Sequence, residues 1–180
     1  MNDSVRGLNR IRSIFEEHTD IICRGKSDSP AEFGHKLLFA TGKSGIITHY
    51  EVCRGNPGDN TLLAEVLQEH ERIFGQAPEK LTGDRRFYSA ANEELAQSKG
   101  VKFVAIPKPG NLSEERRSWQ NSPWFKKLQR FRAGIEGNLS TLLRKFGLKR
   151  CPWKGWEAFC SYVGAAVLAY NLWKIALLAA

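Results

Sequence analysis

The sequence predicts a mixed α/β domain in which an antiparallel hairpin precedes a parallel β-α-β unit and helices end the chain. Three observations support this prediction. Two β-rich runs, 33–41 and 45–53, are separated by the turn Gly-Lys-Ser at 42–44. Two shorter β-rich runs, 80–83 and 101–106, enclose a helical pattern. A chain of 180 residues that is 42% hydrophobic is long enough for one domain with a packed core.

Capping residues and apolar spacing predict the helices between these strands. A helix after the hairpin is expected to have Asp59 as its N-cap and Gly75 at its end. Ser89 is the expected N-cap of a second helix, which Gly100 closes. The strand before this second helix ends at Asp84, and open α/β sheets place their chemistry at the carboxyl ends of parallel strands.

The last third of the chain predicts a polar loop over 107–123, a basic helix over 124–146 and an apolar helix over 158–180. The apolar helix is expected to be a buried core helix and not a membrane span, because Asn171 and Lys174 lie within it. This order of elements is typical of an RNase H-like mixed sheet, or of part of one.

The net charge of +8 is concentrated in one segment. Residues 102–154 hold 13 Lys and Arg against three acidic residues, a local net charge of +10, whereas residues 1–101 carry a net charge of −2. Such a segment favours a polyanionic partner such as nucleic acid. Four widely spaced cysteines indicate neither a zinc ribbon nor a disulfide framework, which favours a reducing compartment.

Two acidic residues stand out in this pattern. Asp84 follows a strand, and Glu136 lies in a helix otherwise rich in Lys and Arg. Glu136 is either a salt-bridge partner or, with Asp84, a ligand of Mg²⁺. Mg²⁺ prefers oxygen ligands, and two such ions together stabilise the attacking and leaving oxygens in phosphodiester chemistry. Arg132, four residues earlier, lies about 40° away around a helix and is placed to orient Glu136 or to hold a phosphate.

Several motifs together resemble those of one family. Residues 131–140 (FRAGIEGNLS), followed by 146–150 (FGLKR), resemble the glutamate region of insertion-sequence transposases of the DDE class. Residues 83–89 (GDRRFYS), with Asn92 after them, are similar to the second-aspartate motif of that family. Further matches are FGHK at 33–36, GNPGD at 55–59 and Asn171-Leu172, so that the resemblance extends from Arg12 to Leu178.

The resemblance implies an RNase H-like transposase catalytic region that cleaves phosphodiesters and transfers DNA strands. It implies Asp84 and Glu136 as catalytic ligands of Mg²⁺ or Mn²⁺, with transposon-end and target DNA as partners. A homodimer that pairs two ends, no membrane, and a cytoplasmic, nucleoid-associated location are also expected. The residues expected to contact the DNA backbone are Lys126, Lys127, Arg130, Arg132, Arg144 and Lys145.

The sequence also departs from the family pattern. Leu143 stands where a lysine is expected, and Arg86 where glycine is common. Similar transposases carry the first catalytic aspartate on an earlier strand, and Asp20 is the nearby acid considered for that role.

The chain is therefore predicted to be the carboxyl-terminal portion of one catalytic domain, truncated before its first strand and inactive. Residues 12–110 are expected to form the sheet and crossover helices. Residues 111–180 are expected to form the basic loop, the glutamate helix and the closing helix. The alternative is a non-catalytic DNA-binding module that uses the basic segment 102–154.

Overall fold

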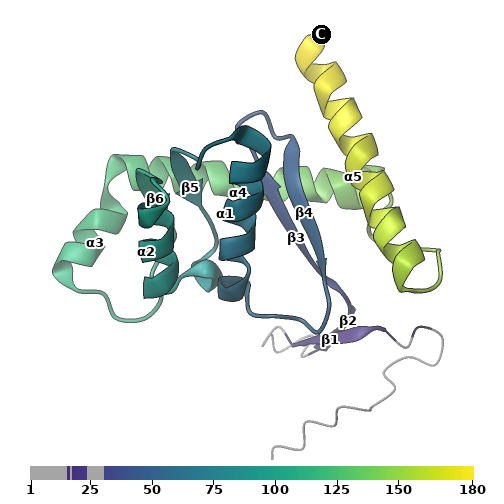
Figure 1. Ribbon diagram of the computed structural model, residues 1–180, viewed down its shortest axis with the longest axis horizontal. Helices are drawn as coiled ribbons and strands as arrows, with labels where there is room; N and C mark the ends of the chain where they lie inside the picture. The colour runs from purple at the N-terminus through teal and green to yellow at the C-terminus, as the bar shows by residue number, and fades with distance from the viewer. Residues whose placement is uncertain (1–15, 17, 24–30) are drawn as a thin grey trace, which may run out of the picture.

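A computed structural model of the chain describes residues 16, 18–23 and 31–180 (Figure 1). The expected start of the sheet region at residue 12 lies outside these residues. The strands are β1 (Asp20–Cys23), β2 (Ala31–Gly34), β3 (Lys36–Thr41), β4 (Ile47–Cys53), β5 (Lys80–Thr82) and β6 (Phe103–Ala105). The helices are α1 (Leu63–Phe74), α2 (Ala90–Ser98), α3 (Glu114–Asn121), α4 (Pro123–Lys145) and α5 (Trp156–Ala179), with 3-10 turns η1 (Asp59–Thr61) and η2 (Arg85–Phe87).

The predicted hairpin is present as β3 and β4. Its antiparallel register runs from Lys36 opposite Cys53 to Ala40 opposite His49, and then shifts so that Thr41 lies opposite Ile47. A bulge of this kind places one extra residue on one strand and redirects the side chains that follow. Ile47 consequently joins the apolar cluster on the α5 side of the hairpin.

The predicted parallel unit is present as β5, α2 and β6, with Leu81 opposite Val104 in parallel register. Ser89 caps α2 as expected, because its hydroxyl accepts the backbone N–H of Asn92 at 3.0 Å. The expectation for Asp59 was wrong. Asp59 begins η1 instead of capping α1, and its carboxylate pairs with Lys36 Nζ at 2.7 Å.

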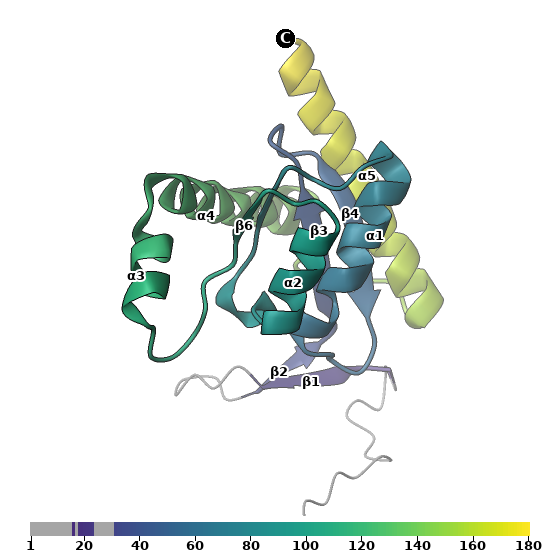
Figure 2. The same ribbon diagram turned by 60° about the vertical axis from the view of Figure 1, so that its left-hand side comes forward.

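The hairpin and the parallel pair form one interrupted layer. Among the described residues, β3–β4 and β5–β6 are separate two-stranded sheets with no backbone pairing between them. Figures 1 and 2 show β3 on the side of the hairpin nearer to β5, with α1 over one face of the layer and α4 along the other. The mixed α/β architecture is confirmed, whereas a single RNase H-like sheet stays a prediction.

The expectation that α5 is a buried core helix is only partly correct. Val163, Ala166, Val167 and Tyr170 are buried against the hairpin and α4. The last turns of α5 project beyond the strands (Figure 1) and leave several leucines exposed. A helix of 24 residues is about 36 Å long, whereas a strand of seven residues spans about 23 Å. By length and composition alone, α5 is long and apolar enough to cross a membrane, and 22% of its most apolar stretch of 18 residues is buried.

The segment 107–123, predicted as a loop, contains the helix α3. Ser113 caps it by accepting the backbone N–H of Arg116 at 3.2 Å, and Glu114 and Glu115 occupy its first turn. Acidic residues at this position are favourable because they face the positive end of the helix dipole. These capping signals outweigh the polar composition that suggested a loop.

Candidate functional site

Asp84 lies two residues beyond the end of β5, at the carboxyl edge of the parallel pair. Its backbone carbonyl accepts the N–H of Phe87 at 3.0 Å and so begins the turn η2. Its carboxylate makes no capping hydrogen bond, and the residue is exposed. The turn therefore holds the backbone of Asp84 in place and leaves its carboxylate oxygens available to solvent or to an ion.

The helix α4 is held across the carboxyl ends of β5 and β6 by Gln129. The Nε2 atom of Gln129 donates to Thr82 Oγ1 at 3.0 Å and to the carbonyl of Ala105 at 2.6 Å. It also lies 3.4 Å from the carbonyl of Gly83, the residue before Asp84. One amide side chain thus connects the glutamate-bearing helix to the backbone next to Asp84.

Glu136 lies two turns after Gln129, about 10 Å further along the helix axis and about 20° away around it. Its Oε1 atom is 3.2 Å from Arg132 Nη2, and the side chain of Glu136 is 70% exposed. The expected proximity of Arg132 and Glu136 is confirmed. Further along α4, Leu142 packs with Ile47 of the hairpin. Glu136 therefore lies between the part of α4 that contacts β5 and β6 and the part that contacts the hairpin.

Two glycines, Gly134 and Gly137, flank Glu136 within α4. A Cβ atom added at either position would meet nothing within 4 Å. Packing within the described residues therefore does not require glycine at these positions. The surface of α4 around Glu136 is low and open to the close approach of another molecule.

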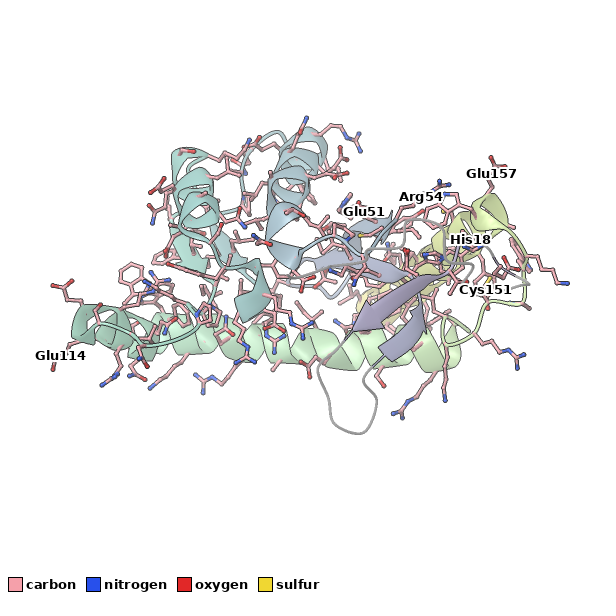
Figure 3. The ribbon with its side chains drawn as sticks, turned by 90° about the horizontal axis from the view of Figure 1, so that it is seen from below. His18, Glu51, Arg54, Glu114, Cys151 and Glu157 are labelled. Atoms are coloured by element: carbon pink, nitrogen blue, oxygen red, sulfur yellow. The ribbon has the colours of Figure 1, made fainter. Side chains whose placement is uncertain are left out.

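The predicted DNA-contacting residues lie along α4. Lys126, Lys127 and Arg130 are exposed in its first half, and Figure 3 shows nitrogen-tipped side chains along the outer side of the helix. Lys126 and Arg130 also border a shallow surface depression. At the other end, Arg144 and Lys145 are exposed, and Lys145 Nζ lies 4.2 Å from the centre of the Trp173 ring on α5.

Asp20 lies at the start of β1 and is buried. Its Oδ2 atom accepts the backbone N–H of Gly55 at 2.8 Å and lies 3.4 Å from His35 Nδ1. The structure does not bring Asp20, Asp84 and Glu136 together as ligands of one ion. Within the described ranges, the one group of three such side chains that lies close enough is formed by His49, Glu51 and Glu65.

A second cluster, around His35, was not foreseen from the sequence because its members are far apart in the chain. His18 Nδ1 lies 2.7 Å from His35 Nε2, and His18 Nε2 lies 2.8 Å from Glu16 Oε2. Burial, reinforced by the charge of His18, lowers the pKa of His35. The backbone N–H of Gly155 donates to Glu16 at 3.0 Å and lowers the pKa of that carboxyl. The cluster connects the start of β1 to the start of α5.

The structure thus places one acid after β5 and another on α4. A family model described as the transposase DDE domain matches residues 19–172 of the chain. The chain therefore belongs to the transposase DDE domain family, as the motifs predicted. Comparison with curated proteins and with solved structures found no match.

Membership of this family assigns the chain to DNA transposition and implies dependence on a divalent metal ion. It also favours a soluble cytoplasmic protein with DNA as its partner.

Proposed function

We propose that Asp84 and Glu136 are two metal-binding carboxylates of a transposase active site that cleaves phosphodiesters and transfers DNA strands. The family match, which spans both residues, is the observation that supports this proposal most strongly. The position of Asp84 at the carboxyl end of β5, and the contact of Gln129 with the neighbouring Gly83, also support it.

The donor set fits Mg²⁺ or Mn²⁺, since both acids offer carboxylate oxygens at exposed positions. When bound, such ions stabilise the attacking and leaving oxygens of phosphodiester chemistry. Arg132 restricts the orientation of the Glu136 carboxylate through its ion pair. Lys126, Lys127, Arg130, Arg144 and Lys145 attract the DNA backbone, and the low surface at Gly134 and Gly137 lets the backbone approach Glu136.

We infer that a third carboxylate comes from a strand seated between β3 and β5. The layer is interrupted at that position among the described residues, and the middle of α4, which carries Glu136, lies between its contacts with the two halves. Residues 1–180 then form the carboxyl-terminal portion of the catalytic domain, with the sheet in 12–110 and the glutamate and closing helices in 111–180. Without this strand the site lacks one ligand, and the loss of one member of a catalytic unit removes most of its activity.

Metal binding and DNA nicking test this assignment separately. We expect Asp84→Asn and Glu136→Gln each to weaken Mn²⁺ binding in calorimetric titration, whereas Glu114→Gln on α3 leaves it unchanged. Purified chain with Mg²⁺ or Mn²⁺ is expected to leave a plasmid carrying transposon ends uncut. Unchanged Mn²⁺ binding in both variants contradicts the ligand assignment. Efficient cleavage that Asp84→Asn abolishes contradicts the incomplete site and supports Asp84 as a ligand.

A second candidate function is a non-catalytic DNA-binding module, which is favoured by the exposed basic residues of α4. Fluorescence anisotropy with duplex DNA should then show affinity that falls steeply with salt and does not depend on Glu136→Gln. Replacing Lys126, Lys127 and Arg130 by glutamine should weaken binding and reduce the salt slope by about 0.9 for each lost phosphate contact. Lys43→Gln, in the hairpin turn, is the matched control. Binding that does not change with salt contradicts both functions.

We also propose that a homodimer of the protein holds two transposon ends. Attachment to chromosomal DNA would place the protein in the nucleoid. Light scattering of the protein with and without end DNA tests the first, and cofractionation with chromosomal DNA tests the second.

A further inference from the structure

Three side chains with metal-binding atoms meet between the hairpin and α1. His49 and Glu51 are two residues apart on β4, so their side chains project from the same face of the strand. Glu65 lies in the first turn of α1. One ligand atom from each of the three lies within 4.8 Å of the others. Figure 3 labels Glu51 on the side of the hairpin that faces α1.

The surroundings make this group costly to leave without a cation. Leu38 lies opposite Glu51 on β3, and it forms an apolar cluster with Cys53 and Leu62 beside the group. Charged groups next to such a cluster lose part of their hydration. Ala40 lies opposite His49, and its small side chain leaves space at that end of the group.

Two atoms of the group are shielded from solvent and have no hydrogen-bond partner among the residues that the structure describes. These atoms are His49 Nε2 and Glu51 Oε2. Nearly all buried polar atoms in proteins are paired, so two such atoms in one group indicate a missing partner. Among the described residues, neither Glu51 nor Glu65 takes part in an ion pair. A cation between the two carboxylates would supply a partner for both of them.

We propose that His49, Glu51 and Glu65 form a binding site for a divalent transition-metal ion of the Zn²⁺ class. One imidazole nitrogen with two carboxylates is a ligand set that suits Zn²⁺, whereas Mg²⁺ prefers oxygen ligands alone. Ligand atoms around one tetrahedral Zn²⁺ lie about 3.3 Å apart, so the group has to contract slightly. Glu65 is exposed, and its side chain is able to make that movement. Water completes the coordination.

The ion would fasten the first turn of α1 to β4 and so stabilise the contact between helix and hairpin. This site shares no residue with Asp84 and Glu136, and it does not depend on the proposed function. Because the ion binds only the folded arrangement of three ligands, its binding should raise the melting temperature.

Calorimetric titration of the chelator-treated full chain with ZnCl₂ tests the proposal. We expect one Zn²⁺ site that is at least about tenfold weaker in Glu65→Gln and in His49→Gln. Two controls should keep the Zn²⁺ site. One is the double variant Asp84→Asn, Glu136→Gln, and the other is His70→Gln, which changes a histidine on α1 that is not a proposed ligand. Zn²⁺ should raise the melting temperature of the parent chain and not that of Glu65→Gln.

Co²⁺ absorption distinguishes this site from binding by thiols. A nitrogen and oxygen site gives no intense sulfur-to-metal charge-transfer band, and the visible spectrum should be the same in Cys151→Ser. Unchanged Zn²⁺ affinity in Glu65→Gln, or the absence of any Zn²⁺-dependent rise in melting temperature, would overturn the proposal. If His49→Gln does not fold, Glu65→Gln decides the question because its position is exposed.

Discussion

A side-chain amide connects each half of the strand layer to a helix. The hairpin half is connected to α5 and the parallel half to α4, and the two amides lie in different surroundings. In the hairpin half, Asn171 of α5 accepts the N–H of Ile47 and donates to its carbonyl, both at 2.9 Å. In the parallel half, Gln129 of α4 donates to acceptors at the ends of β5 and β6. Each amide side chain satisfies strand groups that would otherwise need another hydrogen-bond partner.

The two halves differ in what surrounds this amide. Asn171 lies next to the apolar cluster that includes Leu142, Val163 and Tyr170, whereas the residues of α4 around Gln129 include several exposed lysines and arginines. Apolar packing thus dominates the contact of the helices with the hairpin. In the parallel half, the polar contacts of Gln129 accompany an aromatic contact, because the ring centres of Trp124 on α4 and Phe103 on β6 lie 5.3 Å apart. The removal of one polar contact in the parallel half is therefore expected to cost less than the loss of the apolar contact of Leu142.

The largest expected effect comes from the apolar anchor of the hairpin half. Leu142 is 1% exposed, and Leu142→Ala should lower the free energy of unfolding by about 2–5 kcal/mol because it leaves a cavity. Urea unfolding followed by tryptophan fluorescence measures this change. Leu139→Ala, on an exposed position of the same helix, is the control. Equal losses in the two variants would contradict the apolar anchoring of α4.

The next largest effect is expected at Asn171. Asn171→Ala leaves both backbone groups of Ile47 without their partner, which should cost about 1–3 kcal/mol of the free energy of unfolding. Leu172→Ala, at the neighbouring exposed position, should change stability much less. If both variants unfold at the same urea concentration as the parent chain, water replaces the Asn171 contact at no cost.

A double variant tests whether the two halves contribute independently to stability. Gln129→Ala should cost about 1–2 kcal/mol on its own, less than Leu142→Ala. Because Gln129 and Asn171 share no hydrogen-bond partner, the two losses should add to within about 0.5 kcal/mol. Urea unfolding of the single and double variants measures this sum. A larger deviation would show that the halves respond as one unit.

The smallest effect is expected from pH. The pKa of His35 in the folded protein lies below its ordinary value of 6.5, so the unfolded chain binds this proton at a higher pH than the folded protein does. The contribution of His35 to the free energy of unfolding is therefore fully present above pH 6.5. This contribution is lost as the pH falls below that value. Melting temperatures measured from pH 8 down to about pH 5 should show this fall, and His35→Asn should reduce it.

His70 on α1 provides a comparison for this measurement. Burial also lowers its pKa, but without the charge of a second histidine beside it. His70→Asn should therefore reduce the pH dependence less than His35→Asn does. The opposite order would contradict the role of His18 in the cluster.

The sequence correctly predicted the elements whose formation depends on residues that are neighbours in the chain. The turn at 42–44, the Ser89 cap and the helix over 124–146 depend on residues close together in the chain, and all three are present. The i, i+4 proximity of Arg132 and Glu136 is predictable for the same reason.

Long-range contacts could not be predicted in this way. The interruption between β3 and β5 depends on how distant strands pair, and no residue pattern states it. The group formed by His49, Glu51 and Glu65 was also missed, because Glu65 joins it from a different element. The spacing of His49 and Glu51, two residues apart on one strand, was the one available signal for this group. It accounts for only two of the three proposed ligands.

The glycines beside Glu136 have a mechanical consequence. Each glycine within a helix costs about 1 kcal/mol relative to alanine, so Gly134 and Gly137 weaken the middle turns of α4. Gln129 fixes the helix on one side of these turns and Leu142 fixes it on the other. We therefore expect α4 to be more flexible in the turns around Glu136 than at either contact. The backbone amides of these turns should exchange with solvent hydrogen faster than those near Gln129 and Leu142.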